Sequence, residues 1–110
     1  MTYEDFVAIG IELPGVEETP RKDGSSVTRD ERSMFWLKKW ELLCIKMDWD
    51  KHDELLEQYP AILYKTPHFD SYPALHAHLD LLSQELAKEL IRFSWEDAPN
   101  KVKFRKMLKL

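Results

Sequence analysis

The sequence predicts an α+β fold in two layers, with a mainly antiparallel sheet of about five strands and the helices on one face. Three observations support this. Apolar residues recur at helical spacing near both ends, apolar and aromatic residues alternate in the middle, and short turn-like segments connect these regions. A chain of 110 residues with 44% hydrophobic residues fits one domain with its own core. The expected element order is α-β-β-β-α-β-β-α.

The first helix is expected over residues 2–11. Thr2 is a suitable N-cap, and Asp5 lies three residues later, as in a capping box. Pro14 and Gly15 then favour a type II turn. Residues 17–30 are polar and rich in turn-forming residues, so we expect a flexible loop there that leads into a short strand near residues 26–29. The apolar face of the helix consists of Tyr3, Phe6, Val7 and Gly10.

The clearest strand signal covers residues 34–38 and 42–47, with a tight turn at Lys39 and Trp40. Both strands carry apolar residues on both faces, which predicts a central pair covered in part on each side. Strict alternation predicts that Phe35 and Leu37 share one face of the first strand, and that Met34 and Trp36 share the other.

The second half of the chain is expected to contain two further helices and a hairpin between them. A helix is expected from Asp50 as N-cap to Pro60, which ends it. Residues 61–65 and 74–80 are expected to form an antiparallel hairpin around the loop 64–73. The last helix begins after Ser83, a good N-cap, and runs to about Trp95. We divide the chain into a domain of residues 1–98 and a basic C-terminal tail of residues 99–110.

Composition excludes several classes of function. The formal charge of −4 argues against a strongly basic nucleic-acid-binding fold, although the tail is basic. Cys44 is the only cysteine, so no disulfide within the chain and no thiolate cluster is expected, and its place in a strand predicts burial. No signal peptide and no apolar run of ~20 residues is present, so we expect a cytoplasmic protein without a membrane partner.

Four stretches then occur in a characteristic order: "LPGVEE", "KMD", "YKTPHFDSYP" and "SWEDAP". With these motifs the sequence resembles the MmcQ/YjbR family of small bacterial proteins over roughly residues 2–102. The resemblance implies DNA binding and a fold likened to that of frataxin (CyaY) or of type III secretion chaperones. The chain departs from the family pattern in "RDERSMFW", which replaces a glycine-containing hairpin, and in His76 and His78, which follow the "YP".

The loop "YKTPHFDSYP" is a candidate site with two interpretations. The favoured one is a rigid connection, because two prolines reduce its conformational freedom. In the other, a small surface binds phosphate or a partner. His76 and His78, with His68 nearby, raise the alternative of a metal site, but a fourth ligand is lacking. We therefore expect no metal and no cofactor. The residues of the functional interpretation are Lys65, His68, Phe69 and Tyr72.

The nucleic-acid hypothesis rests on basic residues near the first hairpin and in the tail. They would contact phosphates, and Trp40 or Phe69 would stack on a base. No motif of an enzyme is present, so we expect a non-enzymatic protein. The competing hypothesis is a protein-interaction or chaperone-like module that binds a peptide or forms a homodimer. The candidate nucleic-acid-binding residues are Arg29, Arg32, Lys38, Lys39, Trp40, Lys101, Lys103, Arg105 and Lys106.

Overall fold

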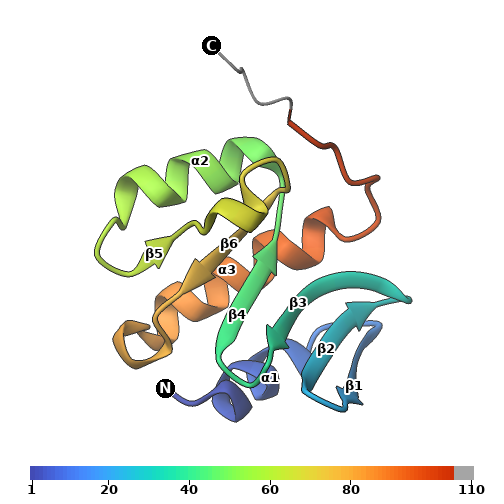
Figure 1. The fold of residues 1–110 in the computed structure, drawn as a ribbon. Coiled ribbons are helices and arrows are strands. Elements are labelled where there is room, and N and C mark those ends of the chain that lie inside the picture. Colours follow the sequence, from blue (N-terminus) through green and yellow to red (C-terminus); the bar gives the residue numbers. More distant parts are fainter. Residues whose placement is uncertain (106–110) are drawn as a thin grey trace.

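The computed structural model describes residues 1–105. These residues form three α-helices and a six-stranded sheet in which every neighbouring pair is antiparallel, in the order β1-β2-β3-β4-β6-β5 (Figure 1). The fold is therefore α+β, as predicted. The helices and strands are α1 Tyr3–Ile11, β1 Val16–Arg21, β2 Gly24–Arg29, β3 Arg32–Lys38, β4 Leu42–Lys46, α2 Trp49–Gln58, β5 Leu63–Tyr64, β6 Ala74–Ala77 and α3 Gln84–Asp97, with 3₁₀ turns at Pro67–Phe69 and Leu79–Leu81.

The sheet has one strand more than the sequence suggested. The expectation of a flexible loop before residue 26 was wrong, because residues 16–21 form β1, which pairs with β2 from Val16↔Arg29 to Arg21↔Gly24. The short strand expected near residues 26–29 is part of β2. β1 is an edge strand whose residues after Val16 are all exposed. Its polar sequence therefore lacks the alternation that reveals a half-buried strand. The element order is α-β-β-β-β-α-β-β-α.

Two tight turns join the central strands. Asp30 and Glu31 between β2 and β3, and Lys39 and Trp40 between β3 and β4, all have positive φ angles of 48° to 70°. Two consecutive residues with positive φ are typical of the type I′ turns that match the twist of a hairpin. The predicted turn at Lys39 and Trp40 is confirmed.

A β-bulge interrupts the alternation of β3. Val27 pairs with Phe35 and Thr28 with Ser33, so Met34 is the extra residue on β3. The bulge turns Met34 towards the same core as Phe35, and both side chains are fully buried. The expectation that Met34 shares a face with Trp36 was therefore wrong.

The helix boundaries follow from their caps. Thr2 and Asp5 form the predicted capping box of α1, and Ser83 caps α3 as predicted. The N-cap of α2 is Asp48 and not Asp50, since the Asp48 carboxylate accepts the backbone N–H groups of Asp50 and Lys51.

The main core lies between the helices and one face of the sheet. α3 lies behind β4 and β6 in Figure 1, α1 contacts α3 and β1, and α2 lies beside β5. Phe6 of α1 meets Phe35 edge to face at 4.8 Å, and Leu90 of α3 and Leu55 of α2 are buried in the same cluster. The opposite side of the sheet, which we call the open face, has a smaller apolar cluster that includes Cys44, Phe69 and Ala74. Within residues 1–105, no helix is long and apolar enough to cross a membrane.

Candidate functional site

The strand register builds the open face from one row of side chains. Ser26 of β2 pairs with Trp36 of β3, and the row continues through Cys44 of β4 and His76 of β6 to Tyr64 of β5. Because partners in register project to the same side of a sheet, these five residues form one line across the open face.

The two residues in the middle of this row, Cys44 and His76, are buried. Burial raises the pKa of the Cys44 thiol to about 12, so it remains protonated near neutral pH. His76 is fully buried and its Nδ1 donates to the carbonyl of Leu43 at 3.0 Å. Burial lowers the pKa of His76, so the ring is neutral and its Nε2 accepts from the Thr66 hydroxyl at 2.9 Å. Neither group has the exposure that a nucleophile or a proton-transfer residue needs.

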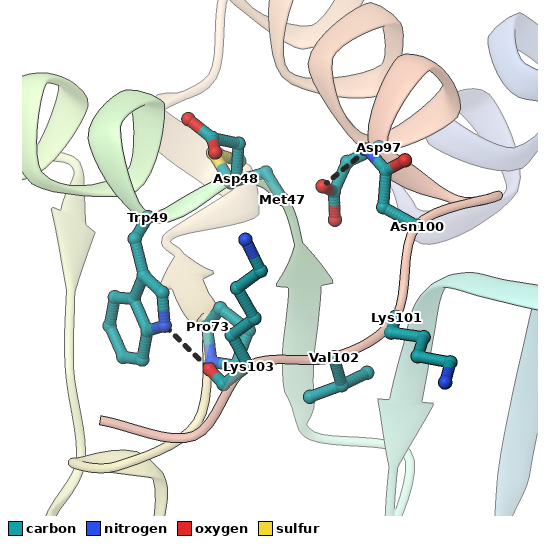
Figure 2. Close-up of a pocket in the computed structure, with 9 residues that line it drawn as sticks. All are labelled: Met47, Asp48, Trp49, Pro73, Asp97, Asn100, Lys101, Val102 and Lys103. Atoms are coloured by element: carbon teal, nitrogen blue, oxygen red, sulfur yellow. Dashed lines mark hydrogen bonds between the residues drawn. The ribbon is translucent and has the colours of Figure 1, made fainter. Parts of the chain in front are cut away.

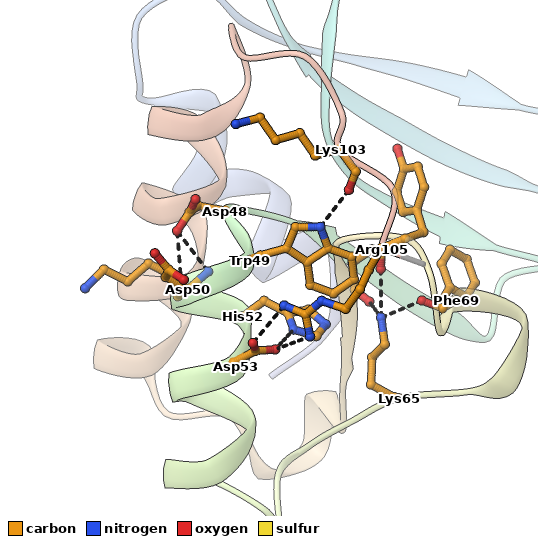
Figure 3. A network of polar contacts seen from close by, with 12 residues as sticks. Asp48, Trp49, Asp50, His52, Asp53, Lys65, Phe69, Lys103 and Arg105 are labelled. Carbon is orange, nitrogen blue, oxygen red and sulfur yellow. Dashed lines mark hydrogen bonds and ion pairs between the residues drawn. The ribbon is translucent and has the colours of Figure 1, made fainter. Parts of the chain in front are cut away.

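Lys65 organises the loop that follows β5. Its ammonium group donates to three backbone carbonyls, those of Phe69 at 2.6 Å, Tyr72 at 2.8 Å and Ala74 at 2.7 Å (Figure 3). Burial lowers the pKa of Lys65 to about 8. Since an ammonium group has three N–H donors, Lys65 is fully engaged with the chain. Its role is to hold the loop closed so that Phe69 and Tyr72 lie against the open face.

Four aromatic rings gather where this loop meets β3. Phe69 and Tyr72 both contact Trp36, with ring centroids 6.3 Å and 6.2 Å from the indole, and Phe104 meets Tyr72 at 5.5 Å. Phe69 is buried, Trp36 and Tyr72 are half-buried, and Phe104 is 70% exposed. We call Trp36, Phe69, Tyr72 and Phe104 the aromatic platform.

Two hollows of about 320 Å³ each adjoin the platform, and Trp36 and Tyr72 line both of them. One hollow is polar, with hydroxyl groups and two cations at its walls. The other is mainly aromatic. The Lys38 ammonium lies 5.9 Å from the centroid of the Phe69 ring. Further side chains of the polar hollow belong to Arg21, Asp23, Ser26, Ser33 and Lys38, and those of the aromatic hollow to His68, Phe69, Ser71 and Phe104.

The predicted phosphate-binding residues do not form one group. Arg29 stacks on Trp95 at 3.7 Å and donates to its carbonyl at 2.8 Å, which ties β2 to α3. Arg32 begins β3 and Lys38 ends it, so about 20 Å separates them at the usual rise per residue of a strand. Lys39 and Trp40 lie in the turn beyond Lys38, where Trp40 is 59% exposed. Of this first-hairpin set, Lys38 lines a hollow of the open face.

The beginning of the basic tail packs against the domain. We call residues 101–105 the C-terminal strap. The Trp49 indole donates to the carbonyl of Lys103 at 2.6 Å, and the Arg105 backbone N–H donates to the carbonyl of Ser71 at 2.8 Å. The Arg105 guanidinium stacks on Trp49 at 3.9 Å and pairs with the Asp53 carboxylate at 2.8 Å and 3.3 Å (Figure 3). Lys101 and Lys103 are exposed, and Lys106 lies outside the described residues.

The three histidines of the metal alternative have different surroundings. His76 is buried, His78 is exposed and stacks on Tyr64 at 4.5 Å, and His68 is exposed in the 3₁₀ turn of the loop. Among residues 1–105, no three or more His, Cys, Asp or Glu side chains gather in a way that could hold a metal ion.

Sequence reasoning did not identify Trp36, Ser26, Ser33 or Phe104 as site residues. The cross-strand register that places Ser26 beside Trp36 would have been a signal for the first two, but it depends on recognising β2 in full. The contact of Phe104 with Tyr72 brings together two segments far apart in the chain, and no local pattern predicts it.

Comparisons with known proteins bear on the fold. No family model and no curated protein matches the sequence. Among solved structures, the chain is similar to that of Deinococcus radiodurans protein DR2400, described with the domain DUF419, with a TM-score of 0.71 and 22% identity. The match covers 91% of this chain and 80% of that one. DUF419 is related to the MmcQ/YjbR family. At this level of identity the likeness shows a shared fold.

Proposed function

We propose that this domain is a non-enzymatic, MmcQ/YjbR-like protein that binds single-stranded nucleic acid on its open face. The observation that carries the proposal is the aromatic platform with cations beside it. Trp36 and Tyr72 line both hollows, and Lys38 and Arg21 stand at the wall of the polar one. Bases stack on aromatic rings in proteins that bind single strands, while nearby cations meet the phosphates.

The single-stranded form fits this surface better than a duplex. Trp36 on β3 and Tyr72 in the loop before β6 are half-buried, so a base must be free of its partner to lie against their rings. The local charge also fits. The polar hollow has two cations and one acid, Asp23, on a chain whose formal charge is −4. We therefore expect modest affinity and a clear dependence on salt.

The non-enzymatic part of the proposal rests on the buried row. The thiol of Cys44 and the imidazole of His76 are the groups with the chemistry for catalysis beneath the open face. The pKa of Cys44 is raised to about 12, and both ring nitrogens of His76 are engaged by the chain. Both groups serve to support Trp36 and the loop.

The experiment is fluorescence anisotropy with labelled single-stranded and duplex oligonucleotides of the same sequence, across a salt series. We expect the single strand to bind more tightly and its affinity to fall as salt rises. Absence of binding at low salt, or a preference for the duplex, would contradict the proposal. The competing hypothesis predicts instead a partner captured in a pull-down, if the module binds a peptide, or a sedimentation coefficient that rises with protein concentration, if it forms a homodimer.

A further inference from the structure

The C-terminal strap is held by polar contacts at Lys103 and Arg105. A cavity of about 230 Å³ lies between the strap and the body of the domain, lined by Met47, Pro73 and Val102 among others (Figure 2). Lys101 and Lys103 at this cavity are exposed and Val102 is half-buried, so residues 101–103 pack only lightly against the domain. The polar contacts of residues 103 and 105 therefore contribute much of the free energy that holds the strap against the domain.

These contacts form a latch on α2. Asp53 projects from α2 and accepts two hydrogen bonds from the Arg105 guanidinium, which also stacks on the Trp49 indole of the same helix. A bidentate pair fixes the orientation of an arginine as well as its distance. Two backbone contacts, Trp49 to Lys103 and Arg105 to Ser71, set the path of the chain between them.

Phe104 lies in the chain between Lys103 and Arg105, the two residues whose polar contacts hold the strap. Its ring lines the aromatic hollow and meets Tyr72 edge to face at 5.5 Å, yet 70% of the residue is exposed. Such an exposed side chain has little packing of its own to hold it. The contacts of its neighbours therefore determine where the Phe104 ring stands.

We propose that Asp53 and Arg105 are positioning residues that place Phe104 at the edge of the binding face, so that the strap completes the site. This inference rests on the proposed function, because it assigns Phe104 a base or sugar of the bound strand as its contact. This role of Arg105 differs from the expectation that Arg105 contacts phosphate, because its guanidinium is already paired with the Asp53 carboxylate.

The negative charge of Asp53 allows its electrostatic effect on binding to be distinguished from its effect on the position of Phe104. Asp53→Asn removes one negative charge, so electrostatic attraction alone would strengthen binding of a polyanion. If Asp53 positions Phe104, the same change must weaken binding. Glu57→Gln is the matched control, because Glu57 is an exposed carboxylate on the same helix, and its loss changes the net charge equally.

The first measurement needs no nucleic acid. Limited trypsin digestion reports how often the strap leaves the domain, because Lys101, Lys103 and Arg105 are cleavage sites within it. We expect Asp53→Asn to be cut in the strap several-fold faster than the wild type, and Glu57→Gln to be cut at the wild-type rate. Equal rates in the two variants would overturn the latch.

The second measurement is anisotropy with the single-stranded oligonucleotide at low salt. We expect Phe104→Ala to bind about fivefold more weakly, the low end for loss of one stacking ring. Asp53→Asn should also bind more weakly. The double variant Asp53→Asn/Phe104→Ala should bind no more weakly than Phe104→Ala alone, because both substitutions remove the same contact, that of the Phe104 ring with the strand. Tighter binding by Asp53→Asn, or additive losses, would overturn the positioning role. If the wild type does not bind, the proposed function and the proposed role of Phe104 both fail. Trypsin digestion still tests independently whether the pairing of Asp53 with Arg105 holds the strap.

Discussion

The indole of Trp36 and the phenol ring of Tyr72 lie edge to face, with centroids 6.2 Å apart and planes at 78°. One residue comes from the middle of β3 and the other from the loop before β6, and together they separate the polar hollow from the aromatic hollow. Edge-to-face pairs stabilise each other's orientation beyond the area they bury. The pair is thus a rigid centre for the open face.

Replacement of Trp36 tests the platform directly. Trp36→Leu keeps an apolar side chain on β3 but removes the stacking surface, so we expect affinity for a single-stranded oligonucleotide to fall by about fivefold to a hundredfold. Trp40→Leu is the matched control, because Trp40 is exposed in the turn beyond Lys38 and lies outside the hollows. A loss in Trp40→Leu with none in Trp36→Leu would show that the turn, and not the platform, holds the base.

Lys65 is predicted to matter for stability. Lys65→Met keeps an unbranched side chain, one heavy atom shorter, but leaves the carbonyls of Phe69, Tyr72 and Ala74 without their common donor. The carbonyls of Phe69 and Tyr72 each keep a backbone N–H donor, those of Tyr72 and Ala74, but three hydrogen bonds from a charged group are lost. We therefore expect a loss of about 2–4 kcal/mol in urea unfolding and faster proteolysis within residues 66–73. A variant as stable as the wild type would show that water replaces the ammonium at no cost.

The ion pair of Lys46 and Asp97 offers a second test of stability. The ammonium of Lys46 lies 2.8 Å from the Asp97 carboxylate, and the two side chains are 3% and 14% exposed. Asp97→Asn leaves a buried charge without its counter-ion, which costs about 3–5 kcal/mol.

Glu96→Gln serves as its control. Glu96 is adjacent in the chain, but its side chain is 57% exposed and its contact with Arg92 is 3.9 Å long. Surface pairs of this kind contribute less than about 1 kcal/mol. Chemical unfolding of the two variants should therefore differ clearly, and similar values would mean that the end of α3 relaxes to hydrate Lys46.

The buried histidines predict sensitivity to acid. Burial lowers the pKa of His52 and of His76 below the ordinary value of 6.5, so the unfolded chain binds more protons than the folded one below that pH. Their contribution is fully present above pH 6.5 and is lost as the pH falls through the lowered folded-state pKa values.

His52→Phe should reduce this sensitivity. The Nε2 atom of His52 is buried and has no hydrogen-bond partner among residues 1–105, so an apolar ring removes an uncompensated polar atom. We expect the melting temperature at about pH 7.5 to stay the same or rise, and its drop on acidification to about pH 5 to become smaller. A variant that melts lower at neutral pH and keeps the full acid drop would contradict this account of His52.

The sequence predicted those features that depend on neighbouring residues. Thr2 with Asp5, Ser83 before α3, and the turn at Lys39 and Trp40 are local signals, and each was confirmed. The N-cap of α2 was misplaced by two residues, because Asp48 and Asp50 are both suitable caps and the sequence does not decide between them.

The remaining features depend on contacts between distant segments. β1 is polar because it lies at the edge, and Met34 enters the core because of a bulge that only the pairing with β2 reveals. The loop "YKTPHFDSYP" was expected to be stiffened by its prolines, but the three hydrogen bonds of Lys65 close it. The pairing of Arg105 with Asp53 across 52 positions has no local signature.

The most direct test of the central claim is a nuclear magnetic resonance titration of the four tryptophan indole N–H signals with a single-stranded oligonucleotide. The signals are assigned by single substitution. We expect the Trp36 signal to shift most, while the signal of Trp95, which stacks under Arg29 and donates to the carbonyl of Pro14, stays in place. Shifts confined to Trp40, or no shift at low salt, would contradict binding on the open face.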